Sequence, residues 1–331
     1  MNSDLRTRTD GTNKKYINRA NNLLKRFKAN TSLSIDDAEG EAEFVKWLIK
    51  ITTNKSDSNW RQLRASCVYY FSQIDRNVLS KTIEAIDGSH AVNSSLLQAT
   101  SSQKKKSVSQ DEEAKIVSAL LASASSSKPS YYDKPTLAVF KAMLLIGVRP
   151  SEFEHALYYD QPIEGISLQP PVVKVRNAKA TNGRSFGEYR YIGLSQLVEN
   201  DLRWVLMAVG YCANPTDKDG RAIKFDDYYD HLRKRIYSIG LRLFPRSKKR
   251  VTLYSARHQL IANLKASGYT LPDIACIVGH GNDVTATEYY GKKRVGIKSS
   301  NLPLANPDDI VKIRKKFTGN LPTKEHKPNK S

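Results

Sequence analysis

Residues that commonly build metal sites and disulfide frameworks are scarce in this chain. It has three cysteines in 331 residues and no CxxC pair; the cysteines are Cys67, Cys212 and Cys276. This usage argues against a disulfide framework and a zinc site, so we expect the thiols to pack in hydrophobic cores. The histidines form no cluster with Asp or Glu at ligand spacing, and we therefore predict no metal.

Long apolar segments are also missing. No apolar run approaches the roughly 20 residues that a membrane helix needs, and the first residues lack the apolar core of a signal peptide. A hydrophobic share of 40% and a charged share of 26% are typical of a soluble globular protein. We therefore expect a cytoplasmic protein with no membrane partner, and the length favours two domains.

Negative charge is in short supply. The chain has 53 Lys and Arg against 33 Asp and Glu, which gives a formal net charge of +20. Such an excess is typical of a protein that binds a polyanion, so DNA or RNA is the leading partner. An acidic membrane surface or an acidic protein is the alternative that charge alone leaves open.

The domain organisation is predicted from one break in composition. Residues 99–106 are polar and contain no large apolar side chain, as expected of a linker. Before the linker, residues 1–98 contain helical periodicity in three segments, at about 15–29, 37–52 and 58–74. After it we expect a catalytic domain over 107–300 and a basic C-terminal tail over 301–331.

The third N-terminal helix carries a candidate DNA-binding face. Trp60, Arg61 and Arg64 lie within about one turn of each other, which would offer aromatic and cationic groups to a DNA groove. The alternative places Trp60 in the core and both arginines on the solvated surface. For each single residue, this interpretation has about the same weight as the DNA-binding one.

The second domain is predicted to be mainly helical with a small sheet. The alternation of Val173 and Val175 with charged residues, followed by an Asn-Gly turn and a second apolar-polar segment, predicts a β-hairpin over 172–194. Lys179 lies near its tip, where Lys174 and Arg184 are the competing cations. Helices are expected near residues 109–121, 133–146, 197–209, 225–241, 254–267, 271–278 and 284–290.

Four short segments contain the residues most suited to chemistry. They lie at residues 147–152, 255–258, 279–280 and 287–291. In that order they supply two guanidiniums, an imidazole and a phenol. These groups suit metal-free phosphoryl transfer, because cations can stabilise the phosphate oxygens while a tyrosine holds the phosphoryl group.

Together, the four segments resemble the tyrosine recombinases, or phage integrases. The resemblance covers about 107–295, and more loosely the N-terminal half, which looks like that family's core-binding domain. It matches Arg149 to the first arginine, with Glu152 three residues later, and Arg257 with His258 to the second arginine box. His280 follows the family's glycine, and Lys179 is the best match to its hairpin lysine.

The resemblance implies a helical core-binding domain and an α+β catalytic domain that together clamp duplex DNA. It implies site-specific recombination in which Tyr290 forms a phosphotyrosyl bond to a 3′ end. Arg149, Arg257 and His280 would stabilise the transition state, and Lys179 would protonate the leaving oxygen. No cofactor is implied. The family works as a homo-tetramer on two specific recombination sites in double-stranded DNA, and residues 310–317 are a candidate segment to reach a neighbouring subunit.

Two positions depart from the family pattern. Tyr254 occupies the place of the usual histidine, and a phenol with a pKa near ~10 is a poor base at neutral pH. His258 is therefore either a bystander or a partial substitute. Tyr289 and Tyr290 are adjacent and point about 100° apart on a helix, so only one can reach a phosphate. The spacing from Thr287 favours Tyr290, which leaves Tyr289 as a packing residue.

Other functions remain open at this point. A type IB topoisomerase or hairpin telomere resolvase would share the chemistry, and a DNA-binding regulator on an integrase scaffold would explain Tyr254 without catalysis. Taken singly, Arg149 is compatible with a surface cation and His280 with a cap on helix carbonyls. His155 and His231 lie outside the four segments, and we interpret both as structural.

Overall fold

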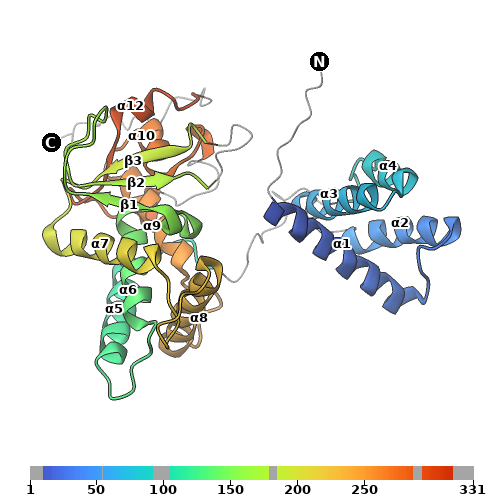
Figure 1. Cartoon of the computed structure of the whole chain (residues 1–331), viewed down its shortest axis with the longest axis horizontal. Helices are drawn as coiled ribbons and strands as arrows, with labels where there is room; N and C mark the ends of the chain where they lie inside the picture. The colour runs from blue at the N-terminus through green and yellow to red at the C-terminus, as the bar shows by residue number, and fades with distance from the viewer. Residues whose placement is uncertain (1–9, 54, 92–103, 179–184, 286–292, 316–331) are drawn as a thin grey trace, which may run out of the picture. The chain divides into compact units, whose positions relative to one another are not determined.

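The computed structural model describes residues 10–53, 55–91, 104–178, 185–285 and 293–315. The chain divides into two compact units, Met1–Ser102 and Gln103–Ser331 (Figure 1). Within the described part, no helix has both the length and the apolar character needed to cross a membrane. The mainly helical class with one small sheet, predicted from the sequence, is confirmed.

The first unit is built from four helices around an aromatic core. They are α1 (Asp10–Thr31), α2 (Ala38–Thr52), α3 (Asp57–Gln73) and α4 (Asn77–Ala85). Phe44 lies at the centre, with ring centroids 5.3 Å from Phe27 and 5.7 Å from Phe71. Edge-to-face contacts of this kind add to the free energy gained by burying the rings. The core therefore joins α1, α2 and α3.

Helix α4 is the element of this unit that the sequence pattern did not predict. It has nine residues, and no side chain caps its first turn. Asp75, in the connection before it, has a left-handed φ of 57°, an uncommon conformation for a residue with a side chain. A short helix without a cap signal gives too little periodicity to be recognised.

The predicted DNA-facing role of Trp60 is wrong. Its side chain is 2% exposed and belongs to the core of the first unit, where its ring meets His90 edge-on at 4.6 Å. The reason is helical spacing, because Trp60 shares a face with Cys67 and Phe71. Arg61 is exposed and pairs with Asp57 at 3.2 Å, whereas Arg64 is half-buried and donates to the Glu84 carbonyl at 2.5 Å.

The second unit has one long buried helix at its centre. This is α6 (Asp133–Ile146), in which 12 of 14 residues are buried. Its neighbours include the other long helices of the unit: α5 (Gln110–Ala124), α7 (Glu199–Ala213), α8 (Phe225–Leu243) and α9 (Leu253–Ala266). The shorter elements are α10 (Leu271–Val278), α12 (Pro307–Ile310) and the 3-10 helices η1 (Pro150–His155) and η2 (Lys293–Val295).

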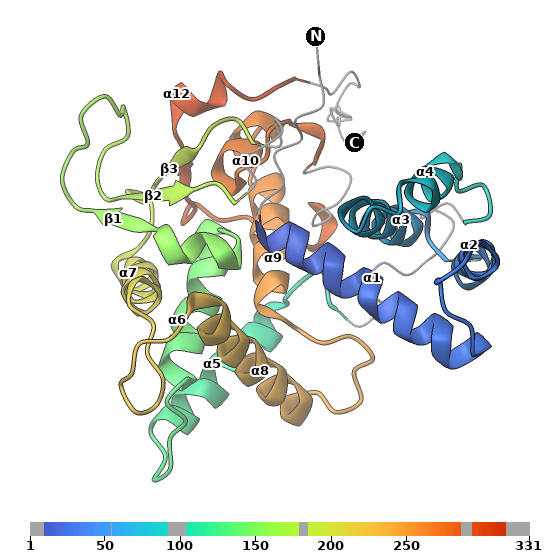
Figure 2. The same ribbon diagram turned by 45° about the vertical axis from the view of Figure 1, so that its right-hand side comes forward.

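A four-stranded antiparallel sheet lies at one end of this unit, with α10 beside it (Figures 1 and 2). The strands run in the order β1 (Leu157–Tyr159), β2 (Val172–Arg176), β3 (Tyr189–Gly193) and β4 (Leu304–Ala305). Strands β2 and β3 confirm the predicted hairpin, although its turn lies outside the described residues. Strands β1 and β4 have three and two residues, too few for an alternating pattern to show in the sequence.

The last residues of the predicted linker belong to the second unit. The backbone N–H of Lys105 donates to the carbonyl of Arg250 at 2.8 Å, and the Lys105 carbonyl accepts from Ser255 Oγ at 2.5 Å. The Lys105 ammonium also pairs with Glu112 in the first turn of α5. Residues 104–106 are thus part of a folded contact, and the linker prediction was too long at this end.

The described part of the predicted basic tail also packs on its own chain. Leu304 and Ala305 form β4 against β3. Ile313 is 5% exposed and clusters with Ala275 and Cys276 of α10. Residues 301–315 therefore complete the fold of the second unit, and Ile310 and Ile313 of the segment predicted to reach a neighbouring subunit pack on this unit itself. The rest of the predicted tail lies outside the described residues.

These contacts predict how the second unit responds to truncation. We expect a fragment of residues 103–331 to fold alone and to unfold at a higher temperature than one of residues 107–331. The shorter fragment loses two hydrogen bonds and a half-buried ion pair, worth about 1–3 kcal/mol together, or about 5 °C for a unit of this size. Thermal unfolding followed by circular dichroism checks this, and equal midpoints would contradict it.

Candidate active site

Three arginines from distant parts of the sequence converge on the carboxyl end of α10. Arg190 Nε donates to the carbonyl of residue 277 at 3.0 Å, Arg257 Nη2 to that of residue 278 at 2.7 Å, and Arg149 Nη2 to that of residue 279 at 3.1 Å. The last carbonyls of a helix have no partner within the helix and carry its negative dipole end. The end of α10 therefore gathers cations.

The first of these arginines is oriented by the turn that follows α6. That helix ends at Gly147, whose φ of 59° is left-handed, and η1 begins at Pro150. The carboxylate of Glu152 accepts the Arg149 backbone N–H at 2.6 Å and Arg149 Nη1 at 2.7 Å. One carboxylate therefore holds both the backbone and the guanidinium of Arg149, whose exposure is 8%.

Glu152 stays ionised although it is only 1% exposed. Burial by itself raises the pKa of this carboxyl, but the guanidiniums of Arg190 and Arg149 outweigh burial and hold the pKa at about 2. The second oxygen of the carboxylate accepts Arg190 Nη2 at 2.7 Å. Two cations thus share one anion, and this group of three side chains has a net charge of +1.

Arg257 and His280 meet on the other side of the same helix end. Arg257 is fully buried in α9; its Nη1 donates to the Gly147 carbonyl, and its Nη2 lies 3.2 Å from His280 Nε2. Gly279, with a left-handed φ of 68°, ends α10 directly before His280. A Cβ on Gly279 would lie 2.6 Å from Arg190 Nη1, so the close packing of the site requires glycine here.

The structure therefore brings together four of the predicted site residues: Arg149, Glu152, Arg257 and His280. The others in the catalytic set, Lys179, Tyr289 and Tyr290, lie outside the described residues. Ala178, directly before Lys179, donates its N–H to Glu152 Oε1 at 3.2 Å. The residue before the predicted hairpin lysine thus reaches the arginine cluster.

Arg190 is the member of the cluster that sequence reasoning missed. Its alternation with Ile192 along β3 places both side chains on the buried face of the sheet. A charged residue at an apolar-facing strand position was the available signal, because a buried charge needs a partner. The partners come from residues 152, 177 and 277, which the sequence alone does not connect.

Tyr254 and His258 lie one turn apart on α9, with ring centroids 5.4 Å apart in an edge-to-face contact. Burial, with Lys106, Arg257 and Lys265 nearby, lowers the pKa of His258 to about 4. His258 is therefore a neutral imidazole at neutral pH. Tyr254 lines a surface groove with four cations and two further tyrosines: Lys104, Arg233, Lys234, Arg250, Tyr229 and Tyr237.

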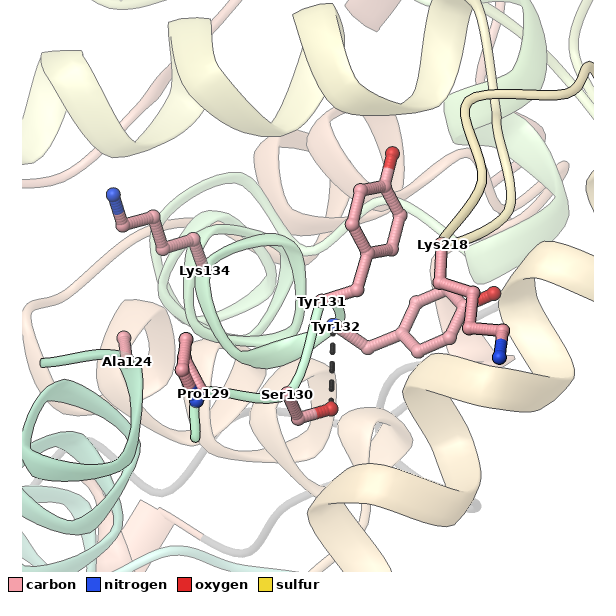
Figure 3. Close-up of a pocket in the computed structure, with 7 residues that line it drawn as sticks. All are labelled: Ala124, Pro129, Ser130, Tyr131, Tyr132, Lys134 and Lys218. Atoms are coloured by element: carbon pink, nitrogen blue, oxygen red, sulfur yellow. Dashed lines mark hydrogen bonds between the residues drawn. The ribbon is translucent and has the colours of Figure 1, made fainter. Parts of the chain in front are cut away.

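Another hollow, near the start of α6, contains none of the predicted site residues (Figure 3). It is lined by Tyr131, Tyr132 and small or basic neighbours, and the hydroxyl of Ser130 accepts the backbone N–H of Tyr132.

The two histidines outside the four segments are placed differently. The His231 ring stacks on Tyr132 at 4.5 Å, while His155 is exposed. Among the described residues, no group of three His, Cys, Asp or Glu side chains could hold a metal ion.

The buried neutral His258 predicts an acid-dependent loss of stability. The unfolded chain takes up a proton near pH 6.5 and the folded chain only near pH 4, so this contribution is complete above pH 6.5 and is lost as the pH falls. We expect up to about 2 kcal/mol of loss between pH 6.5 and 5, before Glu152 titrates.

Urea denaturation across this range checks the prediction. His258→Gln should flatten the dependence, whereas His155→Gln, a change at an exposed histidine, should leave it unchanged. A slope that His258→Gln does not alter would assign the acid sensitivity to another group.

Comparison with known proteins identifies the fold through solved structures and not through sequence. No protein-family model matches the chain, and no curated protein matches its sequence. Among solved structures, the integrase of transposon Tn1549 in complex with transposon right end DNA has 14% identity and a TM-score of 0.50, over 86% of this chain and 90% of that one.

A lambda integrase tetramer bound to a Holliday junction has 14% identity and a TM-score of 0.48, over 87% of this chain and 74% of that one. XerH bound to a palindromic difH substrate has 16% identity and a TM-score of 0.47, over 81% and 74%. At such identities a likeness shows the fold alone, and of these three only the Tn1549 match is close enough to carry that conclusion. This chain has the fold of the tyrosine recombinases.

Proposed function

We propose that this protein is a site-specific DNA recombinase of the integrase type, which breaks and rejoins DNA through a 3′-phosphotyrosyl intermediate. The observation that carries the proposal is the convergence of Arg149, Arg257 and His280 at one helix end, in a chain with a net charge of +20. A cationic cluster of this kind suits the negative charge of a phosphate under attack. The tyrosine recombinase fold supports the same function.

In the proposed reaction, the phenolic oxygen of Tyr290 attacks a backbone phosphate. The bond from phosphorus to the 5′-oxygen breaks as the bond to the tyrosine forms. Tyr290 releases its phenolic proton to solvent water, and the leaving 5′-oxygen gains one from Lys179. The 5′-hydroxyl of a partner strand then reverses these steps, which restores the tyrosine and leaves no net change in protons or bond types. No cofactor is needed, because the phosphotyrosyl bond conserves the energy of the phosphodiester.

In this mechanism, electrostatic stabilisation of the transition state comes from Arg149, Arg257 and His280. Helix-end carbonyls hold both arginines, Glu152 also holds Arg149, and His280 Nε2 lies 3.2 Å from Arg257 Nη2, all before any DNA binds. Little reorganisation is therefore needed when charge develops on the phosphate. Loss of one such oriented donor typically costs ~10²–10³ in rate. Lysine would not replace either arginine, because it lacks the planar fork that holds two oxygens at once.

Tyr254 favours one alternative strongly enough to be tested. A phenol can donate a hydrogen bond to a phosphate oxygen, but it does not act as the base that a histidine provides there. A DNA-binding regulator on this fold would keep the cations and form no covalent intermediate. A type IB topoisomerase or telomere resolvase would form the intermediate and relax or seal DNA without a partner site.

We further propose that the substrate is duplex DNA containing specific recombination sites, that a homo-tetramer acts on two such sites, and that the protein works on DNA in the cytoplasm. Integration of a mobile element is the matching biological role. Because Ile310 and Ile313 pack on α10 of their own chain, any exchange of this segment between subunits requires these contacts to be released.

The nucleophile assignment gives a direct prediction. Tyr290→Phe should abolish covalent adducts while DNA binding stays nearly intact, whereas Tyr289→Phe should keep adduct formation. Duplexes are first selected for binding from a random-sequence pool and then nicked to make suicide substrates, and adducts are detected as SDS-resistant protein–DNA complexes. Adducts that survive Tyr290→Phe and vanish with Tyr289→Phe would move the nucleophile, and a wild-type protein without adducts would favour the regulator.

A second prediction concerns the first unit. If both units bind phosphates, affinity for random-sequence duplex DNA falls with salt by ~0.9 in log K per contact and per log unit of salt. The 103–331 fragment should then show weaker binding and a shallower slope than the full chain. The double substitution Arg61→Gln with Arg64→Gln should reduce the slope by about 1–2. Equal slopes for the full chain and the fragment would exclude the first unit from the interface.

A further inference from the structure

Arg190 stands out among the buried charged groups because each of its three nitrogens contacts a different segment of the chain. The side chain is fully buried on β3. Its Nη2 donates to Glu152 Oε2 at 2.7 Å, its Nε to the Ile277 carbonyl at 3.0 Å, and its Nη1 to Asn177 Oδ1 at 2.5 Å. These three acceptors belong to three separate segments of the protein.

The three contacted segments are those that carry the proposed catalytic groups. Glu152 holds the backbone and the guanidinium of Arg149. Asn177 lies two residues before Lys179, and the contacted carbonyl lies three residues before His280. One guanidinium therefore joins the turn after α6, the end of β2 and the end of α10.

The contacts also set the charge of the site. A carboxylate paired with Arg149 alone would cancel the charge of that arginine. Because a second guanidinium occupies the other oxygen of Glu152, two cations share one anion, and a positive charge remains for the phosphate. Arg257 adds a further cation at the same helix end.

Packing leaves little freedom around this guanidinium. A Cβ built on Gly279 would lie 2.6 Å from Arg190 Nη1 and 2.7 Å from Asn177 Oδ1, so the two side chains occupy the space beside that glycine. A lysine at position 190 would carry the same charge on a flexible stem, without the fixed fork that reaches three acceptors in different directions.

We propose that Arg190 is a positioning residue for strand cleavage. It orients Arg149 through Glu152 and holds Asn177, two residues before Lys179. This inference rests on the proposed recombinase function and goes beyond it, because Arg190 belongs to none of the four segments that suggested the chemistry.

The test compares Arg190→Lys with Arg176→Lys in the full chain. Arg176 is the matched control, because it lies in the partner strand of the same hairpin but is exposed, with its side chain on Glu188. We expect Arg190→Lys to lower the single-turnover cleavage rate by ~10²-fold, as a small misplacement of catalytic groups does. The dissociation constant for DNA should change by less than about twofold, since a positioning role affects the chemical step.

Hydrogen exchange of the DNA-free protein gives a second measurement that does not depend on cleavage. Arg190→Lys should accelerate exchange in peptides covering residues 149–153, 175–178 and 275–280, and Arg176→Lys should not. If Arg190→Lys does not fold, Asn177→Ser removes one acceptor without removing a buried charge, and it should change both measurements in the same direction.

The outcomes distinguish a failure of the Arg190 positioning role from a failure of the proposed recombinase function. Cleavage by Arg190→Lys at the wild-type rate, or a loss of DNA binding as large as the loss of cleavage, would overturn the positioning role. If the wild-type protein forms no covalent adduct, the proposed function fails. Exchange then still decides whether Arg190 orders the three segments, and unchanged exchange there would overturn the inference.

Discussion

The rest of the site depends on the paired ion contacts of the Glu152 carboxylate with Arg149 and Arg190. A charge that is 1% exposed is costly to bury unless opposite charges and hydrogen bonds surround it. Glu152 meets this requirement with two guanidiniums and two backbone N–H groups, from Arg149 and Ala178. Its partners are thereby fixed in position, because moving either one would leave the charge uncompensated. Burying this carboxylate costs stability, and the same requirement for partners fixes the positions of the two arginines.

The second constraint is the meeting of two helix ends. Helix α6 stops at Gly147 and α10 stops at Gly279, both in left-handed conformations. Arg257 donates to the Gly147 carbonyl and to the last carbonyl of α10, so it joins the two ends. Since helix carboxyl ends carry partial negative charge, a buried cation between them satisfies carbonyls that would otherwise lack partners. Arg257 also contacts His280, the residue directly after Gly279 at the end of α10.

Local signals made much of this predictable from the sequence. Glycine after an apolar helix marks the ends of α6 and α10, and the arginines that follow or face them lie in short recognisable segments. Two assignments failed for different reasons. Trp60 looked like part of a DNA-binding face because two arginines stand beside it, yet helical spacing with Cys67 puts it in the core. Arg190 was missed because its partners lie 13, 38 and 87 residues away.

The nature of the acceptors decides how far the site depends on particular side chains. Each of the three arginines donates to at least one main-chain carbonyl, an acceptor that any residue supplies. Particular side chains are needed where the backbone cannot serve: the glycines in left-handed conformations, the arginines themselves, and the acceptors Glu152 and Asn177. The arrangement therefore depends on where α6 and α10 end as well as on a few side chains.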